Sequence, residues 1–186
     1  MNTAPLAFHR WSPKYRSGEV LVTSSVRQIP ANCWPAELKC RSRMHYFLAD
    51  REASQIRPGA RALLLDQQGF VSEASTAGIV LCRAEEGLVT PQKDKVLPSV
   101  SVEVVASLAG EIGLDFQHRD LTVDDVISAD EIYLCSTSPC LLPVVAVDDT
   151  QIGRGVPGPV FHQLMSAWSH NVGVDILKQA AQFSSR

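Results

Sequence analysis

Four short polar stretches contain side chains that the hydrophobic pattern leaves unexplained, and each stands where one predicted element gives way to the next. Lys39 follows a proline-rich loop and precedes a predicted helix, while Glu73 stands between a predicted strand and a run of small residues. Taken alone, a solvated lysine and a solvated loop glutamate would explain both residues. Small residues, however, let a ligand approach the backbone closely, so Glu73 is also a candidate for facing a pocket.

The other two stretches offer donors for an anion. Residues 97–101 lead into a predicted helix, whose first N–H groups lack partners within the helix and whose dipole favours negative charge. A simpler explanation than anion binding is that Ser99 or Ser101 caps that helix. Residues 135–139 are rich in hydroxyls and follow an apolar strand, and strand ends often carry ligand contacts in sheets flanked by helices.

The elements that must position these stretches follow from apolar spacing and turn residues. Alternation and short apolar runs predict strands at residues 19–28, 62–65, 79–82, 88–90, 132–135 and 144–147 and near Phe116. Helical spacing predicts helices at 40–57, 104–112, 123–127 and 159–168, the first with Met44, Phe47 and Leu48 on its buried face. Mixed hairpins and single helices predict an α+β sheet domain rather than a doubly wound fold.

Composition limits the class of protein. The chain has 186 residues, 17 basic and 20 acidic side chains, and a formal net charge of −3, which gives no support for a nucleic-acid partner. Apolar runs fall far short of the roughly 20 residues that span a membrane, and the first residues lack a secretory pattern. We therefore expect a cytoplasmic protein with no membrane partner. Residues 1–18 are expected to form an irregular arm.

The cysteine and histidine patterns give no sign of a metal site or a disulfide framework. The five cysteines are odd in number and show no CxxC pair, and the five histidines are scattered. We expect five reduced and mostly buried thiols.

The four stretches belong to a longer series of short segments that occur in a fixed order. The series reads K at 39, RSR at 41–43, LADREA at 48–53, LLD at 64–66, GFVSEAS at 69–75, LVTP at 88–91, LPSVS at 97–101, ADE at 129–131, ST at 136–137, LPV at 142–144, IG at 152–153 and GPV at 158–160. Over about residues 20–170 this ordered set resembles the class IV, or fold-type IV, pyridoxal-phosphate enzymes. That family includes the branched-chain and D-amino-acid aminotransferases and aminodeoxychorismate lyase.

The resemblance implies a fold and a pair of reacting groups. Residues 19–180 would form the family's large domain, a mixed sheet or pseudo-barrel with flanking helices, followed by a tail at 181–186. Lys39 would form the Schiff base with pyridoxal 5′-phosphate and then move a proton between substrate and cofactor. Glu73 would pair with the pyridine nitrogen and keep that ring protonated.

The resemblance also implies the residues that hold the cofactor phosphate. Val100 and Ser101 match the turn whose backbone N–H groups and hydroxyl bind the phosphate at a helix N-terminus. Thr137 and Ser138 match a second phosphate contact. No metal is implied.

Several positions depart from the family pattern and bear on the substrate more than on the cofactor. The family usually has asparagine at Gly78 and glycine at Ser99, often an acidic residue at Cys140, and a tyrosine or asparagine near Met44 or Ser42. The family also carries an N-terminal lobe before the strand at Glu19, and we expect this lobe to be missing here.

Three functions remain open at this stage. The first is transamination of a small amino acid of the branched-chain or D type, with a 2-oxo acid as partner substrate, by a homodimer. The second is aminodeoxychorismate lyase, which releases pyruvate; Arg43 stands where the lyase branch often has an arginine. The third is a truncated, non-catalytic interaction domain, favoured by the missing lobe and by Gly78 and Cys140.

Overall fold

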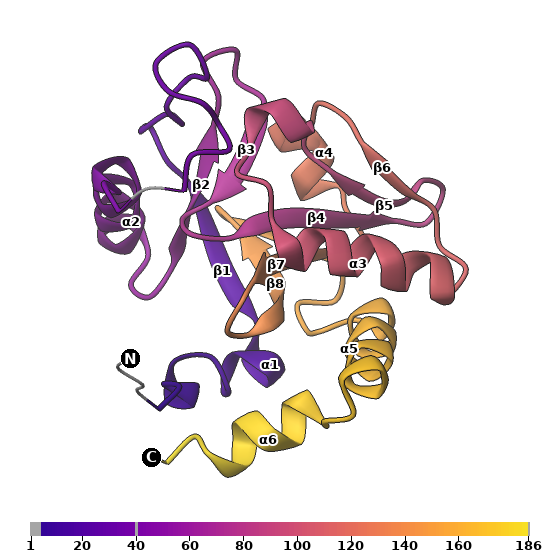
Figure 1. The fold of residues 1–186 in the computed structure, drawn as a ribbon. Helices are drawn as coiled ribbons and strands as arrows, with labels where there is room; N and C mark the ends of the chain where they lie inside the picture. Colours follow the sequence, from indigo (N-terminus) through magenta and orange to yellow (C-terminus); the bar gives the residue numbers. More distant parts are fainter. Residues whose placement is uncertain (1–4, 40, 186) are drawn as a thin grey trace.

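Short apolar runs separated by turn residues pair into one mixed sheet in the computed structural model, which describes residues 5–39 and 41–185 (Figure 1). Within these described residues the sheet has nine strands, in the order β3-β2-β1-β8-β7-β4-β5-β6 with β9 beside β8. The strands are β1 (Glu19–Thr23), β2 (Arg61–Leu65), β3 (Val71–Ala74), β4 (Gly78–Arg83), β5 (Gly87–Thr90), β6 (Phe116–His118), β7 (Glu131–Ser136), β8 (Cys140–Val147) and β9 (Thr150–Gln151). Strand β1 runs parallel to β2 and β8, and β5 runs parallel to β6, while the other pairs are antiparallel. The predicted mixed α+β sheet is therefore confirmed.

The sheet curves strongly between β3 and β4. Strands β2, β1, β8 and β7 separate β3 from β4 in the sheet order, yet only residues 75–77 connect them along the chain. The two strands also contact each other directly, and a bridge joins Ala74 at the end of β3 to Ala77, the residue before β4. This curvature makes a half-barrel and brings Glu73 on β3 close to the strands of the other half.

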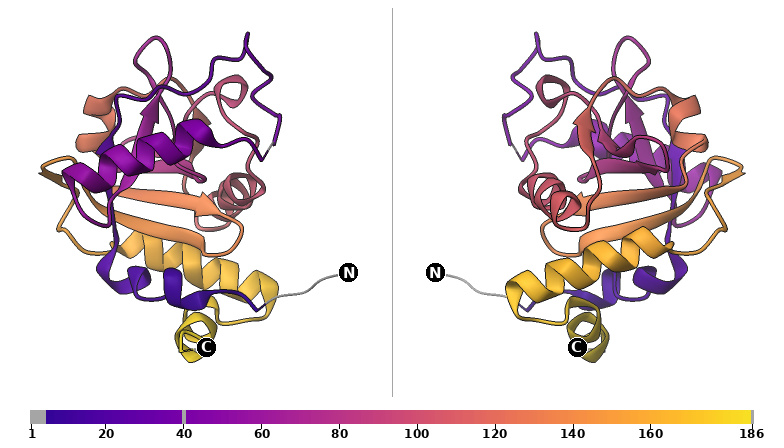
Figure 2. Two further views of the ribbon diagram at one scale, coloured as in Figure 1. Left: turned by 90° about the vertical axis from the view of Figure 1, so that its left-hand side faces the viewer. Right: turned by 90° about the vertical axis from the view of Figure 1, so that its right-hand side faces the viewer.

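Helices cover both sides of the sheet (Figures 1 and 2). They are α1 (Lys14–Ser17), α2 (Met44–Ile56), α3 (Val100–Glu111), α4 (Val123–Ile127), α5 (Pro159–Val172) and α6 (Ile176–Gln182), with single 3-10 turns η1 (Phe8–Arg10) and η2 (Lys93–Lys95). Helices α3 and α5 contact each other and pack on β7, enclosing the main apolar core around Tyr133, Phe161 and Leu108. Helix α2 packs on β1 and β2 and encloses a smaller core around Leu64 and Val22.

Helix α2 differs from its prediction in its start and in its buried face. It begins at Met44 rather than at position 40, which lies outside the described residues. Met44 and Phe47 are 64% and 62% exposed, and Leu48 is exposed as well, so the predicted apolar face is wrong. The helix buries Ala49 and Ala53 instead, because small side chains allow the helix to lie close to β1 and β2.

Two carboxylates on α2 fasten it to the sheet. The Asp50 side chain accepts a 3.0 Å hydrogen bond from the N–H of Ala62 on β2. Glu52 accepts one of 2.9 Å from the N–H of Ser25 and a further bond from the Ser24 hydroxyl. These bonds fix the helix in the orientation that leaves its larger apolar side chains outside.

Other elements follow the predictions with local differences. Strand β1 ends at Thr23 rather than at residue 28, α3 begins at Val100 rather than 104, and α6 and β9 were not predicted. The N-terminal segment forms η1 and α1 and buries Trp11 and Tyr15 in the main core, so its described part is more regular than the predicted arm. Residues 1–4 lie outside the described residues.

Two of the expectations about cysteines and membrane spans can be compared with the structure. Cys82 and Cys135 are buried free thiols, Cys140 is half-buried and Cys33 is exposed, so burial is less general than predicted; Cys40 lies outside the described residues. No helix in the described part of the chain is long and apolar enough to cross a bilayer.

Candidate active site

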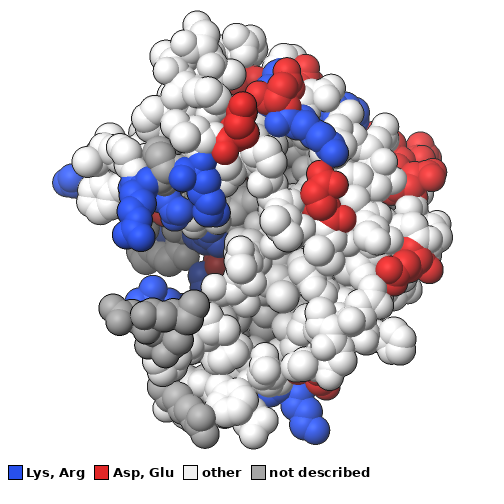
Figure 3. Space-filling view, viewed as in Figure 1, with Lys and Arg blue, Asp and Glu red and all other residues white. Residues whose placement is uncertain are grey.

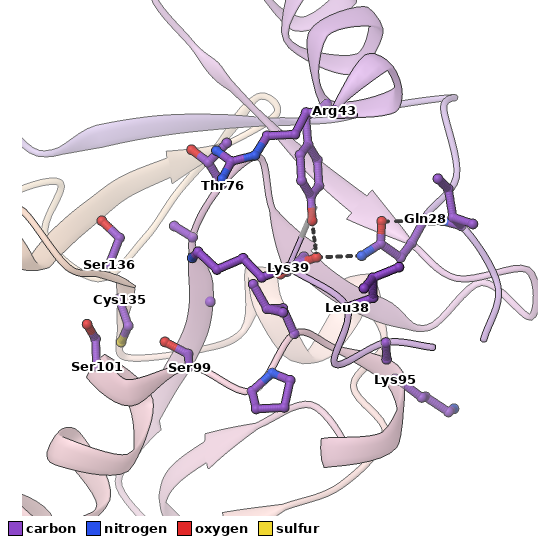
Figure 4. Close-up of a pocket in the computed structure, with 18 of the residues that line it drawn as sticks. Gln28, Leu38, Lys39, Arg43, Thr76, Lys95, Ser99, Ser101, Cys135 and Ser136 are labelled. Carbon is purple, nitrogen blue, oxygen red and sulfur yellow. Dashed lines mark hydrogen bonds between the residues drawn. The ribbon is translucent and has the colours of Figure 1, made fainter. Parts of the chain in front are cut away.

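One cavity of about 600 Å³ collects the candidate residues from five separate segments. Its lining includes the long loop between β1 and α2, the first turn of α2, strand β3, the start of α3 and the turn between β7 and β8 (Figure 4). All six residues that the sequence nominated line it, namely Lys39, Glu73, Val100, Ser101, Thr137 and Ser138. Because these residues span a hundred positions of sequence, only the curved sheet brings them together.

Glu73 is the buried charged group of this cavity. Its side chain is 4% exposed, and its Oε1 accepts hydrogen bonds from the Tyr46 hydroxyl and from Gln28 Nε2. Burial raises the pKa of Glu73, while those two hydrogen bonds and the positive charge of Lys39 act in the opposite direction. Burial therefore favours the neutral form of the carboxyl group, and a cationic N–H placed beside it would favour the charged form.

Lys39 lies in the loop before α2 and is exposed at the mouth of the cavity. Figure 4 shows its side chain extending into the cavity toward the side where Thr76 and Ser136 lie. The Lys39 amine is thus not buried in this structure. Lys39 and Glu73 nevertheless share one cavity, and the lysine is near enough to influence the titration of the carboxyl group.

The start of α3 supplies backbone donors to the opposite wall. Ser99 is the N-cap, and its hydroxyl accepts a 3.3 Å hydrogen bond from the N–H of Val102, as the sequence alternative of a capping serine predicted. The N–H groups of Val100 and Ser101 precede the first intrahelical bond and have no partner within the helix. They belong to the positive end of the α3 dipole, which favours an anion.

The turn between β7 and β8 adds hydroxyl groups to the same wall. Thr137 and Ser138 are exposed in this turn. The turn is fixed from outside the cavity, because the Tyr15 hydroxyl donates a buried 2.7 Å hydrogen bond to the carbonyl of Pro139. The N-terminal segment therefore helps to position Thr137 and Ser138, a role that the sequence did not reveal.

Gly78 explains one departure from the family pattern. An added Cβ at Gly78 would lie 2.9 Å from Val102 Cγ2 and 3.7 Å from Ser99 Cβ. Close packing of β4 on the first turn of α3 therefore leaves no space for a side chain such as asparagine.

Three residues that line the cavity were missed by sequence reasoning or given little weight. Gln28 stands just after β1, and Tyr46 and Arg43 lie at the start of α2. Burial and the negative charge of Glu73 raise the pKa of Tyr46, so its hydroxyl stays protonated and can donate. The signal for Tyr46 was its spacing of three and seven residues from Ala49 and Ala53, which places all three on one helix face.

Positive charge prevails at this side of the molecule. The described lining of the cavity contains three basic side chains, Lys39, Arg43 and Lys95, and one carboxylate, Glu73. Of the three, Lys95 also forms ion pairs with Asp120 at 2.7 Å and with Asp66 at 3.3 Å. Figure 3 shows Lys and Arg side chains gathered at the edge of a hollow near α2. The cavity thus suits a ligand that carries negative charge at one end.

Comparisons with known proteins agree with this arrangement. The family model "Amino-transferase class IV" matches residues 2–147. The branched-chain-amino-acid aminotransferase-like protein 2 of Arabidopsis thaliana is 30% identical over 151 residues, which cover 81% of this chain and 27% of that protein. The D-alanine aminotransferase of Bacillus licheniformis is 24% identical over 127 residues, 68% of this chain and 44% of that protein.

A solved structure shares the fold. The T.th. branched-chain amino acid aminotransferase with pyridoxamine 5′-phosphate superposes with a TM-score of 0.79 at 28% identity, covering 86% of this chain and 53% of that one. The chain thus spans between about a quarter and a half of the lengths of these relatives. Its half-barrel sheet and flanking helices match the large domain of that enzyme class, as the sequence predicted.

Proposed function

The chain belongs to the class IV aminotransferase family, and we propose that it carries the catalytic large domain of a pyridoxal-phosphate-dependent aminotransferase. The substrate would be a small amino acid of the branched-chain or D type, with a 2-oxo acid as acceptor. The observation that carries this proposal is that an amine, Lys39, and a buried carboxyl group, Glu73, line one cavity whose opposite wall offers anion-binding donors.

The residues of the cavity fit this cofactor. A volume of about 600 Å³ lies within the usual range for small-molecule sites. The N–H groups of Val100 and Ser101, with the hydroxyls of Thr137 and Ser138, would hold the phosphate, and Glu73 would accept from the pyridine nitrogen. When bound, the cofactor supplies an aldehyde that condenses with an amine and a ring that withdraws electrons from the reacting carbon.

Lys39 would perform the covalent and proton-transfer steps. Its Nζ would be the amine that holds the cofactor aldehyde covalently, with loss of water, when no substrate is bound. Once released, Nζ would take the proton from the substrate α-carbon and return it to the neighbouring cofactor carbon. The exposed position of Lys39 in a loop allows the side chain to approach and leave the reacting carbon.

Glu73 would control the electronic part of the reaction. A carboxylate beside the pyridine nitrogen keeps that nitrogen protonated, and a protonated ring accepts electron density more readily. The loss of Glu73 should therefore slow proton removal from the substrate more than it weakens cofactor binding.

The proposal includes a homodimer. Met44, Phe47 and Leu48 form an exposed apolar strip along α2, and Leu38 in the preceding loop is exposed as well. A strip of this kind is typical of a surface that another protein covers. Sedimentation or light scattering should give a dimer mass, which Phe47→Glu should reduce to that of a monomer.

Borohydride trapping tests the assignment of Lys39. Purified protein mixed with pyridoxal phosphate should develop an imine absorption band, and borohydride should fix the adduct on the tryptic peptide that contains Lys39. Lys39→Arg should abolish band and adduct. Lys95→Arg is the matched control, because Lys95 also lines the cavity, and this variant should retain both.

The same preparation separates the alternatives. An aminotransferase consumes 2-oxoglutarate when supplied with an amino donor, whereas aminodeoxychorismate lyase ignores it and releases pyruvate from its own substrate. The absence of any adduct at Lys39 would contradict both enzyme functions and would favour a non-catalytic interaction domain.

A further inference from the structure

The loop that carries Lys39 begins and ends at residues that bind the same atom. Gln28 precedes residues 29–43, the part of the loop between β1 and α2 that carries Lys39, and Tyr46 follows them in the first turn of α2. Both donate a hydrogen bond to Oε1 of Glu73 (Figure 4). One oxygen of one buried carboxyl group therefore joins both ends of the Lys39 loop to strand β3.

We propose that Gln28 and Tyr46 are positioning residues: their shared hydrogen bonds to Glu73 Oε1 fix the Lys39 loop over the cavity and leave Oε2 as the carboxylate oxygen available to a ligand. This inference rests on the proposed function for the identity of that ligand. Within the described residues, no hydrogen bond to Oε2 is seen, whereas Oε1 accepts two.

The surrounding contacts make these two bonds important for the loop. Gln28 is itself fixed to the sheet, because its N–H donates a 2.9 Å hydrogen bond to the carbonyl of Leu65 on β2. The side chains of Lys39 and Arg41 are exposed, so they add little buried surface that could hold the loop. The hydrogen bonds to Glu73 therefore add a buried side-chain attachment at each end of the loop, besides the backbone bond of Gln28 and the packing of α2 on the sheet.

The charged groups around Glu73 set the pH dependence of this attachment. Lys39 faces the carboxyl group from the loop, while Arg43 and His45 line the cavity from the start of α2. Burial raises the pKa of Glu73, so the folded protein holds the carboxyl proton more tightly than the unfolded chain does. Stability is therefore expected to fall as pH rises above the ordinary carboxyl pKa of 4.5.

Limited trypsin digestion of the protein without added cofactor tests the proposal. Trypsin can cleave after Lys39, Arg41 and Arg43, and cleavage of a folded protein follows the population of locally open forms. Tyr46→Phe should raise the rate of cleavage in this loop about tenfold, the effect of losing a hydrogen bond to a charged group worth roughly 1.4 kcal/mol.

The matched control is Tyr133→Phe. Tyr133 is also buried and donates a 2.9 Å hydrogen bond to a carboxylate, that of Glu131, but it does not line the cavity. Its replacement should leave cleavage in the Lys39 loop unchanged. Glu73→Met, which removes the shared acceptor, should raise cleavage as well, and Tyr46→Phe should add nothing further in that background.

A pH series separates a positioning role from general destabilisation. Loss of the Tyr46 donor lowers stability most when Glu73 is charged. The ratio of the unfolding equilibrium constants of Tyr46→Phe and the original protein should therefore increase between about pH 5 and pH 8. Independent, additive effects of Tyr46→Phe and Glu73→Met would overturn the proposal. If Tyr46→Phe fails to fold, Gln28→Met removes the other donor. Its cleavage rate and its additivity with Glu73→Met then test the proposal in the same way.

These measurements need no cofactor, so they fail independently of the proposed function. Coupled Tyr46 and Glu73 effects without borohydride labelling of Lys39 would contradict the enzyme assignment while retaining the loop attachment. Labelling of Lys39 with uncoupled effects would retain the enzyme and overturn the role of Tyr46.

Discussion

Gly78 begins β4 directly against the first turn of α3, and we expect Gly78→Ala to disturb both stability and cofactor binding. The added Cβ would lie 2.9 Å from Val102 Cγ2, well inside ordinary contact distance, and 3.7 Å from Ser99 Cβ. Valine has a stiff χ1 angle, so the strain must be relieved by moving the first turn of α3. That turn carries the N–H groups assigned to the phosphate.

The expected magnitude is the difference between a gain and a cost. Replacing glycine by alanine within a strand gains about 0.5–1 kcal/mol by restricting the unfolded chain. Crowding a packed contact by one methyl group costs about 1–3 kcal/mol. We therefore expect Gly78→Ala to lower the unfolding free energy by about 1 kcal/mol and to weaken pyridoxal phosphate binding several-fold.

Gly110→Ala provides the matched control. Gly110 lies within α3, the helix that Gly78 packs against, and an added Cβ there meets no atom within 4 Å, so alanine should stabilise the protein by up to about 1 kcal/mol. Urea denaturation and spectroscopic titration with pyridoxal phosphate measure both effects. A stabilising Gly78→Ala with unchanged cofactor affinity would refute the reasoning, and Val102→Ala should relieve the strain if the reasoning is correct.

Three further predictions concern groups that fix the site from outside the cavity. Tyr15→Phe removes the 2.7 Å hydrogen bond to the carbonyl of Pro139. We expect the unfolding free energy in urea denaturation to fall by about 1–2 kcal/mol and cofactor binding to weaken. Unaltered cofactor binding would contradict a role of Tyr15 in positioning the turn between β7 and β8. Glu131 accepts hydrogen bonds of 2.9 and 3.0 Å from two N–H groups in the first turn of α5. Glu131→Gln should therefore lower the unfolding free energy by about 1–2 kcal/mol in urea denaturation. An unchanged unfolding free energy would show that the charge of Glu131 does not stabilise the N-terminus of α5. The hydrogen bond from the Ser24 hydroxyl lowers the pKa of Glu52, so the stability that this bond adds should be lost as pH falls below about 4.5. Ser24→Ala should make the unfolding free energy fall less between about pH 7 and pH 3. The same fall in the variant as in the original protein would contradict this prediction.

Sequence patterns predicted most strands and helices but assigned the wrong face to α2. Met44, Phe47 and Leu48 show ordinary amphipathic spacing, and large apolar side chains usually face the core. In the structure the helix lies so close to the sheet that Ala49 and Ala53 are the buried residues. Apolar spacing alone cannot reveal this, because it ignores the carboxylates that fix the helix and any surface that covers the outer strip.

The sequence predicted which residues line the site but not the hydrogen bonds that join them. Lys39 and Glu73 could be nominated from ordered motifs, and both line one cavity. The partners of Glu73 could not, because Gln28 and Tyr46 lie 45 and 27 positions away from it in sequence. Helical spacing places Tyr46 on the face of Ala49 and Ala53, but no local pattern pairs either residue with Glu73. Contacts of this kind follow from the curvature of the sheet, which a local pattern does not encode.

The two sides of the cavity are built differently, and this difference suits the proposed chemistry. Glu73 lies on a buried strand, and the donors of Val100 and Ser101 belong to a helix packed on the sheet, so the cofactor would be held by rigid elements. Lys39 belongs to an exposed loop, and a residue that must attach, release and carry a proton needs to move. The two hydrogen bonds to Glu73 Oε1 join these sides, because they attach the loop that carries Lys39 to the same carboxyl group that would hold the ring in place.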